Sequence, residues 1–252
     1  MTVQNVYDTI QSIAPFESQM GFDNAGLLIG SDFQNVTKVG VVLDVTPAII
    51  DQAIEQGVDC IVSHHPIIFS GMHSISVQSS VYRAIRNGIA VISAHTNLDA
   101  AIGGVNDILA SELKLSNVAP LGLPDEPTPA MGRIGILPKV MTDREFAVFV
   151  HERLHTRVKY VPTNKTIERV AVCGGSGADF VDVAMSAGAQ ALVTAEVKHH
   201  VFLAAKEAGF MLVDAGHFET EQPTIVPLCQ KLSHMLSVPV VVLEQSSPVL
   251  YV

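Results

Sequence analysis

Short apolar runs rich in Val and Ile alternate along the chain with amphipathic stretches of helical length. In the first half, this pattern predicts strands at 39–45, 58–63 and 89–94, with helices at 47–56 and 79–87. In the second half, it predicts strands at 169–175, 189–194 and 210–215, with helices at 178–186 and 198–208. Such alternation is typical of βα units around a mostly parallel sheet, so the sequence predicts an α/β protein.

The distance from the first predicted strand of the repeat to the glycine that ends the following helix is the same in both halves. Val39 to Gly57 and Val170 to Gly188 each span 18 positions. Each glycine closes a predicted helix just before a strand, where a left-handed cap is favoured. We interpret the halves as two degenerate copies of one βαβαβ unit, related by a pseudo-twofold axis. The alternative is that any two α/β segments of this length align equally well.

A proline-rich segment separates the halves. Residues 117–130 contain four prolines, which is too many for a helix or a central strand. We therefore predict a linker at 117–130 between a first domain at 1–116 and a second domain at 131–252.

The composition is that of a folded protein that does not span a membrane. The chain has 252 residues, of which 48% are hydrophobic and 16% are charged, enough apolar material for one or two cores. No apolar run approaches the roughly 18 residues that a membrane helix needs. The first residues lack the basic start and apolar run of a secretory signal, which predicts a cytoplasmic location.

Charge and cysteine usage narrow the classes of partner. A formal net charge of −10 argues against general binding of nucleic acids or anionic membranes, which depends on clustered Lys and Arg. The three cysteines are an odd number, and Cys60 and Cys173 lie in strand-like runs, so no disulfide framework is predicted. Metals, small molecules and other protein chains remain as partners.

Histidines and carboxylates follow three of the predicted strands. His64 and His65 end the strand at 58–63, Asp99 follows the strand at 89–94, and His217 and Glu221 follow the strand at 210–215. In open α/β sheets, functional groups gather beyond the carboxyl ends of the strands. This mixture of imidazoles and carboxylates suits zinc, manganese, iron, cobalt or nickel better than magnesium or calcium.

The spacing of these residues favours two ions over one. Adjacent histidines in extended backbone point to opposite sides, so His64 and His65 are expected to serve different ions. A carboxylate can bridge two cations about 3.5–4 Å apart, which makes Asp99 and Glu221 the bridging candidates. His217 and Glu221 share a face if a helix begins after Gly216, and Thr220 between them is a candidate outer hydrogen-bond donor.

Each of these features has a purely structural explanation when taken alone. A His-His pair is often a solvated loop or a satisfied core pair, an Asp after a strand is often a helix cap, and a His four residues before a Glu is often a surface pair. Their joint occurrence at successive strand ends favours the metal site.

Other histidines receive lesser roles. His95 could orient a ligand, carry a proton or simply be buried, and we favour orientation or proton transfer. His151, His155, His199 and His200 are interpreted as exposed helix residues, of which only His200 has a claim on the cleft.

A glycine-rich stretch, CGGSG at 173–177, follows a strand and precedes a helix. Gly174, Gly175 and Ser176 could therefore present backbone amides to an anion such as phosphate. Turn formation by the glycines is the commoner explanation, and the stretch matches neither a P-loop nor a dinucleotide fingerprint.

Five segments resemble one family in order and spacing. FDNAGLLIG, SHHPIIF, AHTNLD, AVCGGSG and GHFETE, spread from about Phe16 to Glu221, resemble the signatures of the NIF-three-like family, also called GTP cyclohydrolase I type 2 homologues or dinuclear-metal-centre hexameric proteins. The resemblance implies two related α/β domains, a toroidal homo-hexamer, and two divalent metal ions per chain on His64, His65, Asp99, His217 and Glu221.

Two segments depart from the family pattern, at three positions. Phe22 stands where the family usually has tryptophan, and Ala195 and Glu196 stand in place of Gly and Asp. None of the three is a predicted ligand, but Glu196 is expected to alter the rim of the cleft. The short linker implies that the inserted domain of longer family members is missing.

The function favoured by these observations is metal-dependent hydrolysis of a nucleotide or phosphoester, with His95 or a carboxylate moving protons. The alternative is a non-enzymatic hexamer that stores or delivers metal, or that binds a regulatory partner.

Overall fold

A computed structural model describes residues 1–122 and 130–250 of the chain. The residues cluster into two compact units: Met1–Ala101 with Ile225–Ser246, and Ile102–Thr224 with the residues from Ser247 onward. The first unit is thus built from two stretches that are distant in the sequence. The predicted domain boundary at 117–130 stays a prediction. Residues 123–129 of that segment lie outside the part of the chain that the structure describes.

The first unit contains a five-stranded sheet in the order β1-β4-β3-β2-β11. Its strands are β1 (Gly26–Ile29), β2 (Val39–Val42), β3 (Cys60–Ser63), β4 (Ala90–Ser93) and β11 (Val240–Val242). All neighbouring pairs are parallel except β1 with β4. Its helices are α1 (Val3–Ile13), α2 (Pro47–Gln56), α3 (Ser80–Arg86), α4 (Thr96–Ala100) and α10 (Ile225–Met235), with a short 3-10 turn, η1 (Phe16–Ser18).

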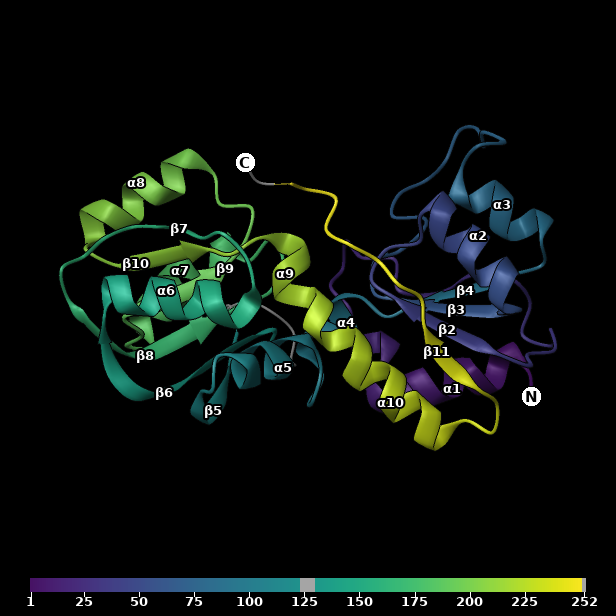
Figure 1. Ribbon diagram of the computed structural model, residues 1–252, viewed down its shortest axis with the longest axis horizontal. Coiled ribbons are helices and arrows are strands. Elements are labelled where there is room, and N and C mark those ends of the chain that lie inside the picture. The colour runs from purple at the N-terminus through teal and green to yellow at the C-terminus, as the bar shows by residue number, and fades with distance from the viewer. Residues whose placement is uncertain (123–129, 251–252) are drawn as a thin grey trace. The chain divides into compact units, whose positions relative to one another are not determined.

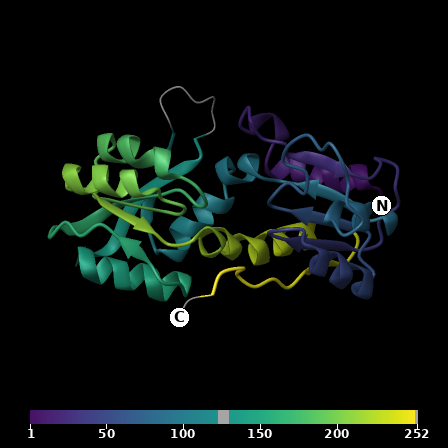
Figure 2. The same cartoon turned by 90° about the horizontal axis from the view of Figure 1, so that it is seen from above.

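Helices cover both faces of this first sheet. Figures 1 and 2 show α2 and α3 on one face and α1 and α10 on the other. The core beneath α2 and α3 consists of buried aliphatic residues such as Ile50, Ile61 and Val91. Since full burial of one such side chain contributes about 1.5–3 kcal/mol, this layer holds the strand ends in fixed positions.

The second unit contains a six-stranded sheet in the order β5-β6-β8-β9-β10-β7. Its strands are β5 (Ser116–Leu121), β6 (Gly132–Thr142), β7 (Lys159–Tyr160), β8 (Thr166–Val172), β9 (Ala191–Thr194) and β10 (Met211–Asp214). Its helical segments are α5 (Val105–Glu112), α6 (Asp143–Leu154), η2 (Ala178–Phe180), α7 (Val181–Ser186), α8 (His199–Ala208), α9 (His217–Glu221) and η3 (Gln222–Thr224). The three central strands β8, β9 and β10 are parallel, and antiparallel strands flank them.

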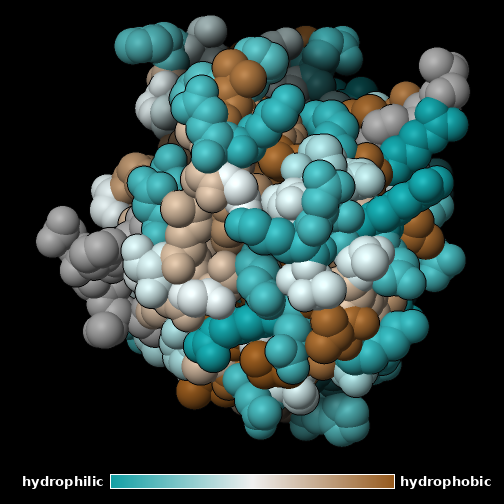
Figure 3. All heavy atoms as spheres, turned by 90° about the vertical axis from the view of Figure 1, so that its left-hand side faces the viewer, coloured by the Kyte–Doolittle hydropathy of each residue, from teal (hydrophilic) through white to brown (hydrophobic). Residues whose placement is uncertain are grey.

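Alternate residues of the central strands supply two separate cores. Val170 and Val172 of β8 pack with α5 and α6 on one face, whereas Ala171 and Cys173 pack with α7 and α8 on the other. This follows from the two-residue period of a strand. Figure 3 looks onto this unit, and hydrophilic residues cover most of the visible face, with hydrophobic residues in separate small patches.

The two units repeat one connectivity. The order β2-α2-β3-α3-β4 in the first unit corresponds to β8-α7-β9-α8-β10 in the second, and the three strands lie in the same order in both sheets. The α/β class and the duplicated βαβαβ unit are confirmed. Gly57 and Gly188, at φ 66° and 79°, have the predicted left-handed conformation, whereas the pseudo-twofold axis stays a prediction.

Residues 116–121, at the beginning of the segment predicted as a linker, form strand β5, and the linker and the domain boundary stay predictions. β5 is an edge strand with only β6 as a neighbour, so Pro120 removes no hydrogen bond that a second neighbour would need.

Cys60, Cys173 and Cys229 are buried, and no disulfide joins them. Burial raises the pKa of the Cys60 thiol to about 12, with a further contribution from Asp59. The thiol therefore stays protonated and acts as a small apolar side chain. Within the described residues, no helix is both long enough and apolar enough to cross a membrane.

Asp143, the first residue of α6, connects this helix to the 163–164 turn. Its buried carboxylate accepts hydrogen bonds from the backbone N–H groups of Thr163 and Asn164, at 2.7 and 2.8 Å. These bonds, from Asn164 first and then from Thr163, lower the pKa of Asp143. A pKa lowered by folding stabilises the protein above the unfolded value of about 3.9, and this stabilisation is lost as the pH falls through the folded pKa.

We therefore expect Asp143→Asn to reduce the free energy of unfolding at pH 7 by ~1–3 kcal/mol, because charged acceptors form the stronger hydrogen bonds. The difference from the wild type should shrink as the pH falls below about 4, because the wild-type carboxyl takes up a proton first in the unfolded chain and then, at the lowered pKa, in the folded protein. Urea unfolding at several pH values measures both effects. Glu152→Gln, on an exposed position of the same helix, is the control, and an equal loss in both variants would contradict the role of Asp143.

Candidate metal site

The first unit gathers three histidines where β3 and β4 end. His64 and His65 follow β3, and His95 follows β4. One ring nitrogen from each of the three lies within 4.8 Å of the others. The ring centroids of His64 and His65 lie 4.9 Å apart, and that of His95 lies 5.2 and 5.5 Å from them. We call these residues the three-histidine group.

The adjacent histidines do not diverge as expected. In a regular strand, alternate residues donate to one neighbour, and successive side chains point to opposite faces. Here the consecutive amides of His64 and His65 both donate to β2 and its extension, at Val42 O and Leu43 O, at 3.1 and 2.9 Å. The backbone has therefore left the regular alternation, which keeps the two rings close together.

Each ring of the group is held through its Nδ1 atom by an oxygen acceptor. The distances are 2.9 Å from His64 to Ala94 O, 2.7 Å from His65 to Asp44 Oδ1 and 2.7 Å from His95 to Asp23 Oδ1. An acceptor at Nδ1 fixes the proton there and leaves Nε2 as the lone-pair donor, the arrangement usual for histidines that bind metals.

Asp23, the acceptor of His95, is held in its charged form by hydrogen bonds. Burial alone would raise its pKa, but hydrogen bonds from His95 and Thr96 outweigh burial and lower the pKa to about 2. The carboxylate accepts from the Thr96 amide at 3.0 Å and also from the Thr96 hydroxyl. Asp23 is therefore charged at neutral pH and fixes the orientation of His95.

Asp99 lies on α4, close to the same group. It is 9% exposed, and its Oδ1 atom lies 3.6 Å from His64 Nε2. His64 itself is 1% exposed. Asp99 Oδ1 and His64 Nε2 are therefore two neighbouring atoms of the kinds that bind a divalent cation, and the contact of His64 Nδ1 with Ala94 O fixes the orientation of the ring.

The second unit carries a histidine and a carboxylate on α9. His217 Nε2 lies 3.1 Å from Glu221 Oε2, four residues along one face, as the spacing predicts. On the opposite side of the ring, His217 Nδ1 lies 2.9 Å from Glu196 Oε1. His217 is thus held through Nδ1 in the same way as the three histidines of the first unit.

Glu196 contacts His217 from a strained backbone conformation, a role beyond the predicted change to the rim of the cleft. Its φ of 53° lies in the left-handed region that non-glycine residues rarely adopt, at a cost of ~1–3 kcal/mol. This strained conformation places its carboxylate on His217 Nδ1. The orienting roles of Asp23, Asp44 and Glu196 were not predicted from the sequence, because each residue lies far along the chain from its histidine. Asp23, for example, lies 72 positions from His95.

The glycine-rich loop packs against α9. The amides of Gly174 and Gly175 donate to Asn106 Oδ1 at 2.7 Å and to Thr220 Oγ1 at 3.0 Å, and the amide of Gly177 donates to Thr194 Oγ1 at 2.9 Å. Of the predicted anion-binding residues, Gly174 and Gly175 use their amides within the protein, and Ser176 is exposed. Anion binding by this loop stays a prediction.

Gly175 makes room for the Glu221 side chain. A Cβ atom on Gly175 would contact Glu221 Oε1 and lie 3.2 Å from His217 Nε2. The loop and α9 are further joined by Thr220, whose hydroxyl lies 2.9 Å from Gly216 O and from His217 O. The loop thus supports the backbone and side chains of α9.

His151, His155, His199 and His200 are exposed, as predicted. His151 belongs to α6, and His199 and His200 belong to α8, whereas His155 follows the last residue of α6 and lies outside the helix.

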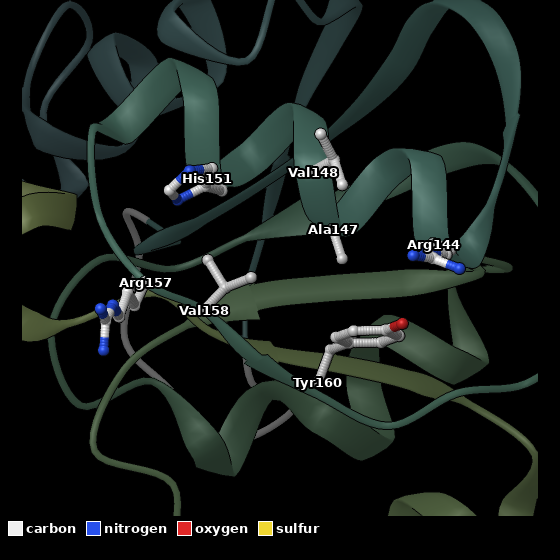
Figure 4. Close-up of a pocket in the computed structure, with 7 residues that line it drawn as sticks. All are labelled: Arg144, Ala147, Val148, His151, Arg157, Val158 and Tyr160. Carbon is white, nitrogen blue, oxygen red and sulfur yellow. The ribbon is translucent and has the colours of Figure 1, made fainter. Parts of the chain in front are cut away.

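A shallow groove on the second unit, of about 350 Å³, lies between α6 and the segment that contains β7. Figure 4 shows Ala147 above and Tyr160 below, with the Tyr160 hydroxyl toward Arg144. None of the predicted site residues lines this groove, so it is separate from the candidate metal site.

The fold and the site together define an α/β protein of two related units whose histidines and carboxylates could bind a metal ion. The chain belongs to the Duf34/NIF3 (NGG1p interacting factor 3) family, whose model matches residues 1–248. The family resemblance found in the sequence is thereby confirmed.

Individual relatives agree with this assignment. A Clostridium perfringens protein named GTP cyclohydrolase 1 type 2 homolog is 32% identical over 243 residues, covering 94% of this chain and 93% of its own. A protein of the same name from Nostoc sp. is 36% identical over 203 residues, 77% of each chain. The crystal structure of a Staphylococcus aureus hypothetical protein superposes with a TM-score of 0.92 at 27% identity, covering 100% of this chain and 99% of the other.

Proposed function

We propose that the protein is a metal-dependent hydrolase in which His64, His65, Asp99, His217 and Glu221 hold two divalent cations. The observation that carries the proposal is the shared Nδ1 contact. The rings of His64, His65 and His217 are each held at Nδ1 by an oxygen acceptor, so each can present a neutral Nε2 atom. Exposed His151 and His234 also have an oxygen acceptor at Nδ1, so the contact supports the proposal only together with the neighbours of the three rings. Asp99 lies beside His64, Glu221 lies beside His217, and His65 lies beside His64.

The chain's own residues then have distinct tasks. When bound, divalent cations lower the pKa of a bound water toward neutrality and polarise the bond to be cleaved. His95 is placed to take up and release the proton. Its Nδ1–H donates to Asp23, and because Asp23 stays ionised, the proton is held on Nδ1 and Nε2 is left as the atom that accepts a proton.

The substrate class follows from the donor set and from the relatives. Imidazoles and carboxylates suit zinc, manganese, iron, cobalt or nickel, which are Lewis acids for phosphoester or ring hydrolysis. The relatives named GTP cyclohydrolase 1 type 2 homolog support a nucleotide or related phosphoester as the substrate.

Elemental analysis of the untagged protein, purified without chelators, tests the proposal directly. We expect about two transition-metal ions per chain, and hydrolysis of at least one member of a panel of nucleotides and phosphoesters that stops on chelation and returns on reloading. Metal without any turnover would instead favour storage or delivery of metal, or a regulatory role. A chain that takes up no metal after reloading would refute the site.

An outer carboxylate provides a finer test. Asp44→Ala removes the acceptor from His65 Nδ1 and should weaken metal binding about 10- to 100-fold, the usual cost of losing such a partner. Competition with a chelating dye measures the affinity. Asp51→Ala, an exposed carboxylate of the same unit paired with Arg83, is the matched control. Equal affinities for the two variants would show that Asp44 has no orienting role.

We also propose that the chain assembles as a toroidal homo-hexamer, as the family resemblance implies. Light scattering after size-exclusion chromatography should give a mass six times that of one chain, and a monomeric mass would contradict it.

A further inference from the structure

Two phenylalanine rings lie exposed beside the three-histidine group. Phe22 is 63% exposed and Phe69 is 52% exposed. Their ring centroids lie 6.5 Å apart with an angle of 51° between the planes. Phe69 also lies edge-on to His95, at 6.1 Å and 82°. One exposed apolar residue is ordinary, but two neighbouring aromatic rings next to a cluster of imidazoles need a reason.

The two rings belong to segments that are joined to each other next to Asp23, the residue that orients His95. Asp23, which holds His95, is adjacent to Phe22 in the chain. Asn24 donates from Nδ2 to Ile68 O at 2.6 Å and so connects this segment to the residue before Phe69. The segment Phe22-Asp23-Asn24 therefore fixes the distance from the two rings to His95.

We infer that Phe22 and Phe69 form a stacking platform that binds the planar heteroaromatic ring of the substrate and so determines its specificity. The inference rests on the proposed function, since it places the substrate beside His95. Two inclined rings offer one face for stacking and one edge contact, the geometries that aromatic groups prefer. Stacking of a base on an aromatic side chain changes affinity roughly 5- to 150-fold.

The test compares ligands with and without a ring at equilibrium. Phe22→Leu and Phe69→Leu keep an apolar side chain but remove the aromatic face, and calorimetry measures binding of GTP, ATP and inorganic tripolyphosphate. We expect each variant to bind GTP and ATP about tenfold more weakly while the affinity for tripolyphosphate and the metal content stay unchanged. Phe33→Leu, at a ring that is 88% exposed, is the control and should change nothing.

The outcomes separate this inference from the metal site. If GTP and ATP bind no more tightly than tripolyphosphate, or if the variants bind them as the wild type does, the platform is refuted even in a protein that holds two metals. Ring binding that depends on Phe69 in a protein without metal would support the platform and refute the hydrolase proposal. Met72, Ile75 and Val77 are also exposed, so a change of mass by light scattering in the variants, with unaltered ring binding, would mean that the rings form a subunit contact instead.

Discussion

Asp99→Ala is expected to remove the bound metal and to abolish turnover. Asp99 is a buried carboxylate with its Oδ1 atom 3.6 Å from His64 Nε2, and it is a candidate to bridge two cations. A bridging ligand contributes to both ions, so its loss should weaken binding by more than the ~10- to 100-fold typical of an outer partner. Elemental analysis and hydrolysis of the best substrate measure the two effects.

Controls separate loss of a ligand from loss of the fold. Asp99→Asn keeps the shape of the side chain but removes its charge, so we expect it to bind metal poorly and to unfold at nearly the temperature of the wild-type apoprotein. His64→Ala should also lose metal, whereas His234→Ala, which removes an exposed helix histidine, should not. Full activity in Asp99→Ala would rule the mechanism out.

Gly175→Ala is expected to displace the Glu221 side chain beside His217 without replacing either residue. The added Cβ atom would contact Glu221 Oε1 and would lie 3.2 Å from His217 Nε2, so the carboxylate must move. Since catalytic and ligand groups must keep their positions within about 0.5 Å, metal affinity should fall at least tenfold. A dye-competition titration measures this loss.

A second glycine isolates the effect of the contact. Gly57 has a φ of 66°, close to the 61° of Gly175, but a Cβ atom on Gly57 would meet nothing within 4 Å. Gly57→Ala and Gly175→Ala should therefore lose similar stability, of about 1 kcal/mol from the left-handed backbone. Only Gly175→Ala should lose metal affinity. Equal metal affinities would show that Glu221 needs no such space.

The parallel part of each sheet could be predicted from the sequence because its signals are local. Helix α2 illustrates this: the Thr46 side chain accepts from Ile49 N, Pro47 occupies the first turn, and Gly57 ends the helix with a left-handed cap. Strands β5, β6 and β7 were missed because they pair antiparallel and lack the continuous apolar runs that mark buried parallel strands, and β5 and β7 are also the two edges of the sheet. In β5, five of the six residues are exposed.

The site was predictable as a set of residue types but not as a geometry. Strand ends indicated His64, Asp99 and His217, because parallel strands bring their carboxyl ends to one edge. The orienting carboxylates carry no such signal. Asp44 and Glu196 each lie 21 positions from the histidine that they hold, and only folding brings them together.

The pairing of β11 with β2 has a consequence for how the chain is made. Val240 lies opposite Val39, so the first sheet receives its edge strand from a segment translated after all the strands of the second unit. At roughly 5–20 residues per second, the ribosome needs on the order of ten seconds to proceed from residue 101 to residue 242. During that interval β2 has an open edge that could pair with another chain. The nascent first unit therefore passes through a period in which aggregation competes with its completion, and the second unit, whose strands are contiguous in the sequence, can finish folding first.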